Sequence, residues 1–198
     1  MKRLIIILLA LFALQTTSLI AQTSDIVNFE AILLDATAIT VTGGQDITVT
    51  FATADDYNNG FLTIVPVTTV EVVSLLDWDM TIAAPDFDNA DGGGDIIPIN
   101  NVGVWCQATG TFQFGAELVC AYTTDATPLG LSNADQDLIT NGTGNNGDAT
   151  ENAFNLNWEM GTGNGSMNPA TMFEQVADGT IGSLGTYNTV ITLTLTTL

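Results

Sequence analysis

The sequence contains no histidine, and its only basic residues are Lys2 and Arg3 among 198 residues. Against these stand 22 aspartates and glutamates, which give a formal net charge of −20 at pH 7. Acid–base catalysis near neutral pH relies mostly on histidine, and phosphate recognition relies on arginine and lysine. Proton transfer by histidine and phosphate recognition by basic side chains are therefore excluded beyond residue 3. Nucleic-acid binding is excluded as well, because its affinity comes largely from cations that neutralise phosphates.

The missing residues also remove most catalytic arrangements. Beyond residue 3, a Ser-His-Asp triad, a Cys-His pair or a Schiff-base lysine cannot be assembled. A hydrolase with paired carboxylates needs only aspartate and glutamate, so it stays open as a remote alternative. The D-[TS]-G signature of aspartic proteases is absent. We therefore predict that the protein is not an enzyme.

The two basic residues have an explanation of their own. Lys2 and Arg3 stand in front of an apolar run, residues 4–14, and a small residue, Ala21, follows it. This arrangement is typical of a secretory signal peptide. We therefore predict a signal peptide over residues 1–21 and a protein that is secreted, extracellular or at the cell surface. No second apolar stretch of about 18 residues or more follows, which predicts no membrane insertion.

Cysteine is also scarce, since Cys106 and Cys120 are the only two. In an oxidising compartment an isolated pair is most simply a disulfide. Closing a loop of about 15 residues would stabilise the fold by roughly 3 kcal/mol in the chain-entropy model. A metal site made of two thiols without histidine is disfavoured. The sequence therefore predicts a Cys106–Cys120 disulfide.

What the chain has in abundance is alternation of apolar and polar residues, whereas amphipathic helical spacing is hard to find. Residues 39–42 and 47–51 alternate around Gly43-Gly44, which predicts a β-hairpin. Residues 132–152 are polar and rich in glycine and asparagine, which predicts a long exposed loop. Further strand-like runs lie at 70–72, 78–82, 96–99, 102–105, 111–122, 154–160 and 190–195. The pattern predicts an all-β fold, a single antiparallel immunoglobulin-like β-sandwich domain over residues 35–198.

Residues 22–34 form a separate strand-like segment directly after the predicted signal peptide. Four of its apolar residues share one parity: Val27, Phe29, Ala31 and Leu33. One reading is the first strand of the chain's own sandwich. The other is a donor strand that inserts into a neighbouring subunit, with backbone pairing and alternate side chains in core pockets. Head-to-tail contacts of this kind do not close, and so they generate filaments.

A resemblance covers most of the chain beyond the signal peptide. It is carried by FATADDYNNG (51–60), LLDWDMTIAA (75–84), IIPINNVGVW (96–105), LSNADQDLI (131–139) and GTYNTVITLTLTTL (185–198). These segments resemble a pattern in small secreted β-sandwich proteins of Bacteroidetes-type bacteria, which are similar to fimbrial-subunit and spore-coat-protein-U-like families. The resemblance implies a pilin-like structural subunit of an extracellular filament, fimbria or surface layer. Its partners would be identical subunits joined by β-strand complementation. The lack of basic residues departs from that pattern, so assembly would rest on apolar insertion, backbone pairing or bridging cations.

One acidic segment has the composition of a cation-binding loop. Asp86, Asp88, Asp91 and Asp95 lie within ten residues, with Gly92-Gly93-Gly94 between the last two. Calcium prefers oxygen ligands from a flexible loop, with aspartates at alternate positions and glycine at the turn. The spacing D-x-D-x-x-D-G is one residue longer than the usual loop, and no glutamate stands at the bidentate position. A solvated acidic loop is the alternative, so no cofactor is required and Ca²⁺ is the one candidate.

The three tryptophans offer a second function, that of a monomeric secreted module that binds carbohydrate or another surface. Exposed indoles beside aspartates can stack on sugars, which would make surface glycans the partners. Alternation, however, places Trp78 in register with Met80 and Trp158 in register with Leu156. For these two we therefore favour packing in the core, while Trp105 carries no assignment.

Overall fold

The computed structural model describes residues 36–198, and these residues form an all-β fold built from antiparallel strands. The prediction of an all-β class is confirmed. The predicted signal peptide and the predicted donor residues Val27, Phe29, Ala31 and Leu33 lie outside the described residues. No helix between residues 36 and 198 is both long and apolar enough to cross a membrane.

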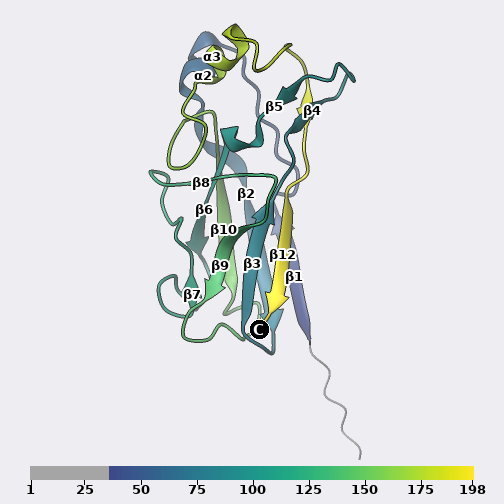
Figure 1. The fold of residues 1–198 in the computed structure, drawn as a ribbon. Helices are drawn as coiled ribbons and strands as arrows, with labels where there is room; N and C mark the ends of the chain where they lie inside the picture. The colour runs from purple at the N-terminus through teal and green to yellow at the C-terminus, as the bar shows by residue number, and fades with distance from the viewer. Residues whose placement is uncertain (1–35) are drawn as a thin grey trace, which may run out of the picture. The chain divides into compact units, whose positions relative to one another are not determined.

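The largest sheet has five antiparallel strands in the order β1-β2-β10-β6-β8 (Figure 1). The strands are β1 (Thr37–Gly43), β2 (Phe61–Ser74), β10 (Ala153–Met160), β6 (Val102–Ala108) and β8 (Leu129–Gly130). The first strand, β1, lies at one end of this sheet. It pairs with the second half of β2, from Thr37 opposite Ser74 to Gly43 opposite Thr69.

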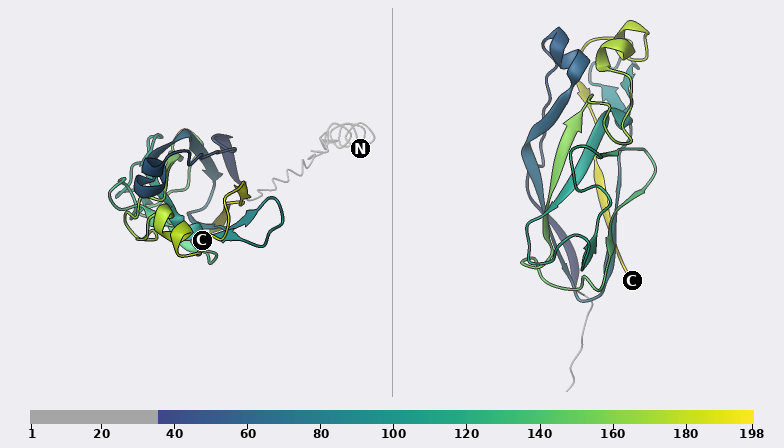
Figure 2. Two further views of the ribbon diagram at one scale, coloured as in Figure 1. Left: turned by 90° about the horizontal axis from the view of Figure 1, so that it is seen from above. Right: turned by 90° about the vertical axis from the view of Figure 1, so that its left-hand side faces the viewer.

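A second sheet has four antiparallel strands in the order β12-β3-β9-β7. They are β12 (Thr192–Thr197), β3 (Trp78–Ala83), β9 (Gln136–Asn141) and β7 (Leu118–Val119). A small third sheet joins β11 (Tyr187–Asn188), β4 (Phe87–Asn89) and β5 (Ile96–Ile97). The strands of the two larger sheets run along a common direction and surround the core (Figure 2).

One apolar core lies between the two larger sheets. Its members follow the period of two, because successive side chains of a strand point to opposite faces. On β10 the residues Phe154 and Leu156 have no exposed surface, whereas Asn155 and Asn157 are half-buried on the outer face. The same alternation buries Trp78, Met80 and Ile82 on β3. Each large apolar side chain stabilises the fold by roughly 1.5–3 kcal/mol when it is fully buried.

Two short helices, which the strand pattern does not predict, lie at one end of the body and contact each other (Figure 2). They are α2 (Ala54–Asn59) and α3 (Met172–Ala177). A 3₁₀ turn, η1 (Ile99–Asn101), follows β5. Each α-helix begins with a capping box: Thr53 with Asp56, and Thr171 with Glu174. The spacing S/T-x-x-D/E before each helix is the sequence signal that predicts them.

The predicted hairpin around Gly43-Gly44 is wrong. β1 pairs with β2, and residues 46–51 belong to no strand within residues 36–198. The cause lies at Gly44, which has a φ of +64° and passes so close to β2 that a side chain there would clash with the Val67 carbonyl. After Gly44, which contacts β2, residues 46–51 leave the sheet and do not pair with β1 as a hairpin would.

The prediction of a continuous exposed loop over residues 132–152 is also wrong. It contains β9, which lies between β3 and β7. Leu138 and Ile139 are at most 2% exposed and enter the core, and Asn145 and Asn152 are fully buried. Two apolar residues in a polar segment are enough to anchor a strand when the neighbouring strands pair with it.

Candidate functional site

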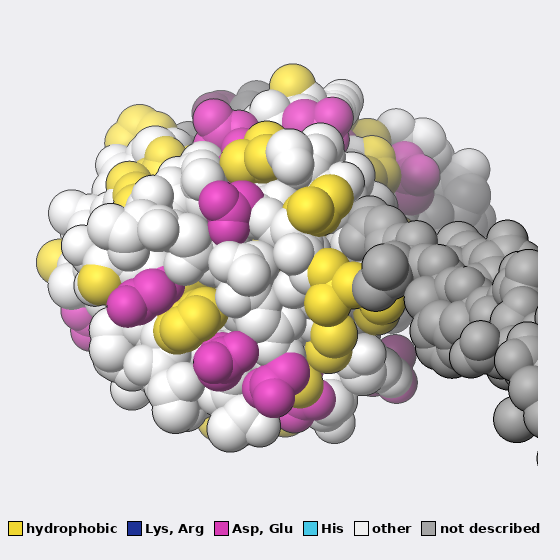
Figure 3. Space-filling view, turned by 90° about the horizontal axis from the view of Figure 1, so that it is seen from below, with side chains coloured by type: hydrophobic (Ala, Val, Ile, Leu, Met, Phe, Trp, Pro, Cys, Tyr) yellow, Lys and Arg dark blue, Asp and Glu magenta, His cyan; other side chains and the backbone are white. Residues whose placement is uncertain are grey.

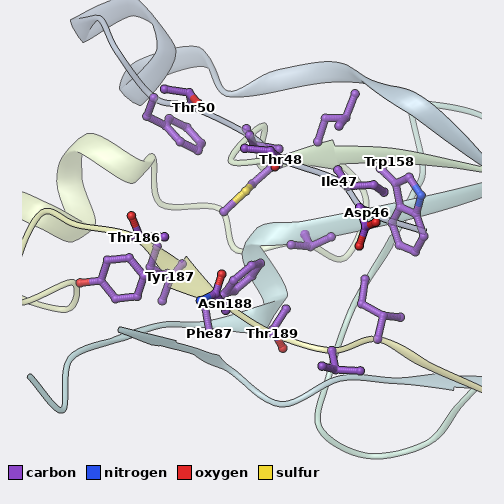
Figure 4. Close-up of a pocket in the computed structure, with 18 of the residues that line it drawn as sticks. Asp46, Ile47, Thr48, Thr50, Phe87, Trp158, Thr186, Tyr187, Asn188 and Thr189 are labelled. Atoms are coloured by element: carbon purple, nitrogen blue, oxygen red, sulfur yellow. The ribbon is translucent and has the colours of Figure 1, made fainter. Parts of the chain in front are cut away.

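An open apolar groove runs along one side of the core, where the two larger sheets end in β1 and β12. Its cavity volume is about 890 Å³. One bank of the groove is residues 44–51, and the opposite bank is residues 183–191 with Leu193. Figure 4 shows the two banks facing each other, with Ile47 and Trp158 on one side and Tyr187 and Thr189 on the other.

The first bank belongs to no strand in the part of the chain that the structure describes. Ile47, Val49 and Phe51 are half-buried and line the groove, whereas Thr48 and Thr50 are exposed. Within residues 36–198, no hydrogen bond joins the backbone of 46–51 to another residue. β-branched residues favour this extended backbone. The segment therefore alternates like a strand, but it has no backbone partner among residues 36–198.

The second bank continues into β12. From Tyr187 to Thr197 half-buried and exposed residues alternate without a break. In the sheet order β12 has one neighbour, β3. The bank is held in place by the pairing of β11 with β4 and by two side chains. The Tyr187 hydroxyl donates to the Ser183 carbonyl (2.6 Å), and the Thr189 hydroxyl donates to the Pro85 carbonyl (2.7 Å).

The floor of the groove is apolar because its one large polar side chain is satisfied internally. Trp158 is 4% exposed, and its indole N–H donates to the Thr68 hydroxyl (2.8 Å). That hydroxyl in turn donates to the carbonyl of Gly44 (2.7 Å). The indole ring is thus left for apolar contact, together with Leu156, Met160, Val102, Ile97 and Met172, all at most 9% exposed.

The lining limits what the groove can do chemically. Among the described lining residues, Asp46, which is exposed, is the only carboxylate, and none is a cysteine. A groove with apolar walls, and with a rim whose backbone is unpaired among the described residues, suits an extended peptide. The backbone of such a peptide pairs with an edge while alternate side chains enter the groove. The site therefore has the properties of a binding site for a strand.

The four aspartates of the predicted calcium loop lie in four different surroundings. Asp86 accepts a hydrogen bond from the amide of Ile99 (2.8 Å), and Asp88 lies within β4. Asp91 is exposed, and Asp95 is half-buried beside Gly182. Within residues 36–198, no group of three or more His, Cys, Asp or Glu side chains is arranged to hold one metal ion. Calcium binding stays a prediction, which thermal melts with and without a chelator would decide.

The two cysteines are brought together. Cys106 on β6 is buried, Cys120 is half-buried, and their thiols are not bonded in this structure. A hydrogen bond between the two thiols raises the pKa of Cys106, with a further contribution from burial, and lowers the pKa of Cys120. The Cys106 amide donates to the carbonyl of Tyr122 (2.7 Å), which fixes the returning loop. The disulfide stays a prediction.

Of the three tryptophans, Trp78 and Trp158 lie in the core, as their alternation predicts. Trp78 has no exposed surface and is held by Asn145, whose side-chain oxygen accepts from the Trp78 amide (2.9 Å). The Trp78 indole N–H also donates to the carbonyl of Asn145 (2.9 Å). Trp105 is half-buried, and its indole N–H has no partner among the described residues.

Glu159 is the unusual carboxylate that sequence analysis missed. It has no exposed surface, and one of its oxygens has no hydrogen-bond partner among residues 36–198. The other oxygen accepts from the Thr162 hydroxyl (2.8 Å) and the Asn164 amide (3.1 Å). Burial raises the pKa of Glu159, opposed by these two bonds and aided by the charge of Asp125. Alternation places Glu159 on the outer face of β10, and nothing in the sequence indicates that a loop covers it.

Comparison with known protein families finds no family model that matches the chain, and comparison with curated proteins finds no match. The function is therefore argued from the groove itself.

Proposed function

We propose that the protein is a secreted structural subunit of an extracellular filament, fimbria or surface layer. In this proposal the body is an immunoglobulin-like, pilin-like sandwich that is open along one side. The groove on that side accepts residues 22–34 of a neighbouring copy as an additional β-strand. The observation that carries the proposal is the apolar groove whose first bank, residues 46–51, has a strand-like backbone without hydrogen bonds within the described residues.

Residues 22–34 suit the groove by their alternating pattern and by their length. An edge with unpaired N–H and C=O groups is a template for pairing with another chain. Val27, Phe29, Ala31 and Leu33 alternate with other residues, so an extended segment presents all four side chains to one face. Residues 23–34 and residues 186–197 would each span about 40 Å at roughly 3.3 Å per residue. The segment thus matches in length the stretch that runs from the second bank to the end of β12.

The charge of the chain also favours this mode of association. Residues 22–198 carry all 22 carboxylates and no basic side chain, so two copies cannot form ion pairs between side chains. Burial of apolar side chains and backbone pairing do not need opposite charges. Repulsion between copies is screened by salt over roughly 8 Å at physiological ionic strength. We therefore expect filaments to form more readily as salt concentration rises.

The test removes the donor and then returns it as a peptide. A chain lacking residues 22–34 is expected to form no fibres in electron microscopy and to bind a synthetic 22–34 peptide. A peptide carrying Phe29→Asp and Leu33→Asp is the matched control, and it is expected not to bind. Fibres from the deleted chain would contradict the proposal.

The alternative of a monomeric glycan-binding module receives no comparable support. It needs indole rings exposed to solvent, but Trp78 and Trp158 are at most 4% exposed and Trp105 is half-buried.

A further inference from the structure

We propose that Glu159 and Asp125 form a binding site for a hard divalent cation, Ca²⁺ in particular, between the outer face of β10 and the turn at residues 124–127. The cation would join this turn to residues 161–168, the loop that covers Glu159. The site is separate from the groove and from the acidic segment 86–95, and it does not depend on the proposed function.

The carboxylate of Glu159 is buried in a chain that has almost no means to neutralise it. Glu159 has no exposed surface, and its oxygen Oε1 has no hydrogen-bond partner among residues 36–198. Beyond residue 3 the chain has no basic side chain, and Figure 3 shows carboxylates on the surface of the body with no basic group in view. Buried charges in proteins are paired or coordinate metals. The counter-charge of Glu159 must therefore come from solution, as a proton or as a metal ion.

A proton alone leaves Oε1 without a partner. A protonated carboxyl oxygen is a hydrogen-bond donor and an unprotonated one is an acceptor, but Oε1 has neither kind of partner in the described part of the chain. The other oxygen, Oε2, already accepts from the Thr162 hydroxyl and the Asn164 amide. A metal ion is a partner that a carboxylate oxygen can take directly.

Asp125 brings a second carboxylate and a carbonyl to the same place. The side-chain nitrogen of Asn164 donates to Oε2 of Glu159 (3.1 Å) and to the main-chain carbonyl of Asp125 (3.4 Å), so it contacts both residues. Burial raises the pKa of Glu159, and the charge of Asp125 raises it further, as expected for neighbouring carboxylates with no cation between them. Asp125 itself is exposed, which gives a cation access from solvent.

The side of Glu159 toward β6 is filled by an apolar side chain. Gly103 lies opposite Glu159 in the register, and a Cβ on Gly103 would meet the sulfur of Met167, which is 5% exposed. The two segments that would share the cation already contact each other, because the Ser166 amide donates to the carbonyl of Pro128 (3.3 Å), directly after the turn. A cation beside Asp125 would therefore strengthen an existing contact.

The ligand atoms decide which cation fits. Carboxylate and carbonyl oxygens favour Ca²⁺ or Mg²⁺ over transition metals. Mg²⁺ demands a near-ideal octahedron, whereas Ca²⁺ tolerates irregular geometry and suits a site made by two loops. Within residues 36–198 no three His, Cys, Asp or Glu side chains surround one metal position, so water must complete the coordination. We therefore expect a dissociation constant of about 10⁻⁴–10⁻³ M, the range of extracellular calcium modules.

Calorimetric titration of the full chain with CaCl₂, at constant ionic strength, tests the site. We expect Asp125→Asn and Glu159→Gln each to weaken calcium binding at this site at least tenfold. Asp125 is exposed, so its variant should fold normally. Asp135→Asn removes the same charge from another exposed position and should bind normally. Asp91→Asn should also keep the site, and any binding that it removes belongs to the segment 86–95.

Thermal melts give a second measurement. At about ten times its dissociation constant a ligand raises the folded-to-unfolded ratio about elevenfold. In a chain of this size that corresponds to a melting temperature higher by roughly 3–6 °C. We expect this rise for the unmodified protein on addition of about 10 mM CaCl₂, compared with NaCl of equal ionic strength, and not for Glu159→Gln. In EDTA the order should reverse, because the variant then has no uncompensated buried charge.

Three results would overturn the inference. The first is unchanged calcium affinity in Asp125→Asn, and the second is a calcium response of Glu159→Gln equal to that of the unmodified protein. The third is a complete lack of calcium binding by the unmodified protein, which would leave a proton as the counter-charge of Glu159. None of these results affects strand insertion, which is measured separately with the 22–34 peptide.

Discussion

The two long sides of the core are closed to different degrees. On the side of β7 and β8, Leu118, Leu129 and Leu131 are at most 4% exposed, and Phe112 and Phe114 from the preceding loop pack against the core. On the side of β1 and β12, the inward residues of both strands and of 46–51 are only half-buried. The same alternating pattern thus gives a finished core on one side and an apolar groove on the other.

Because of this difference, the two sides contribute to different properties: the finished side to folding stability and the groove side to ligand binding. On the finished side Leu118, Leu129 and Leu131 are almost fully buried, so removing one leaves a cavity in close-packed surroundings. Side chains along the groove keep part of their apolar surface exposed to water. A ligand that covers this surface gains binding free energy from its burial. Substitutions on the two sides should therefore act on different measurements.

The largest effect is expected for Phe154→Ala. Phe154 has no exposed surface and packs near Phe114, with ring centroids 6.5 Å apart. The lost side chain and the cavity should lower the free energy of unfolding by about 3–5 kcal/mol, measured by urea denaturation. The matched variant Phe51→Ala, in the groove, should cost clearly less because Phe51 is only half-buried. Equal costs would mean that the groove is as closed as the core.

The next effect is expected for Asn145→Ala, which removes a buried polar connection. The Asn145 side chain accepts from the amide of Trp78 and donates to the carbonyl of Trp78 (2.8 Å). Leaving both groups buried and unpaired should cost roughly 2–4 kcal/mol of unfolding free energy. The neighbouring variant Asn146→Ala, at an exposed position, serves as the control and should be close to neutral. A small change for Asn145→Ala would show that water replaces its bonds.

Much of the core could be predicted from the sequence, because alternation reports burial wherever a strand has neighbours on both sides. Phe154, Leu156 and Trp158 are examples. The groove could not be predicted in this way, since residues 47–51 alternate as regularly as β10 does. What keeps 47–51 out of a sheet is the close approach of Gly44 to Val67, a contact between segments far apart in the sequence.

Other parts of the site also depend on distant contacts. The alternation of β10 predicts that Glu159 lies on the surface, because its burial comes from a loop that covers the outer face. The calcium prediction relied on spacing along the chain, and spacing does not state whether Asp86 turns toward Asp95 or toward the amide of Ile99. The two short helices were not predicted, although the capping boxes that begin them are visible in the sequence.

A third prediction tests the groove directly. Ile47→Asp places a carboxylate on the inward face of the first bank, where an incoming strand would desolvate it. We expect the affinity for the 22–34 peptide to fall by about tenfold or more, which corresponds to at least about 1.4 kcal/mol. Thr48→Asp is the matched control with the same charge on the exposed face, and it should bind normally. Titration calorimetry with the chain lacking 22–34 makes the comparison, and equal losses in both variants would indicate repulsion and not insertion.

The smallest effect concerns Glu159, which belongs to the covered outer face of β10. Burial raises its pKa in the folded protein, so the folded state holds this proton more tightly than the unfolded chain does. Stability from this group is therefore fully present below its ordinary pKa and is lost as pH rises through the raised pKa. Glu159→Gln keeps an oxygen for Thr162 and Asn164 and removes the charge. We expect a higher melting temperature at pH 7, by roughly 2–4 °C per kcal/mol gained, and little change near pH 4.

The control for Glu159→Gln is Asp135→Asn, which removes the same charge from an exposed position. Lowering the net charge of so anionic a chain relieves repulsion wherever the charge is taken away. A burial effect should therefore appear as the excess of Glu159→Gln over Asp135→Asn at pH 7, and it should vanish in acid. If both variants shift the melting temperature equally, the overall charge and not the covering loop sets the behaviour of Glu159. The outer face would then be as open to solvent as the groove side.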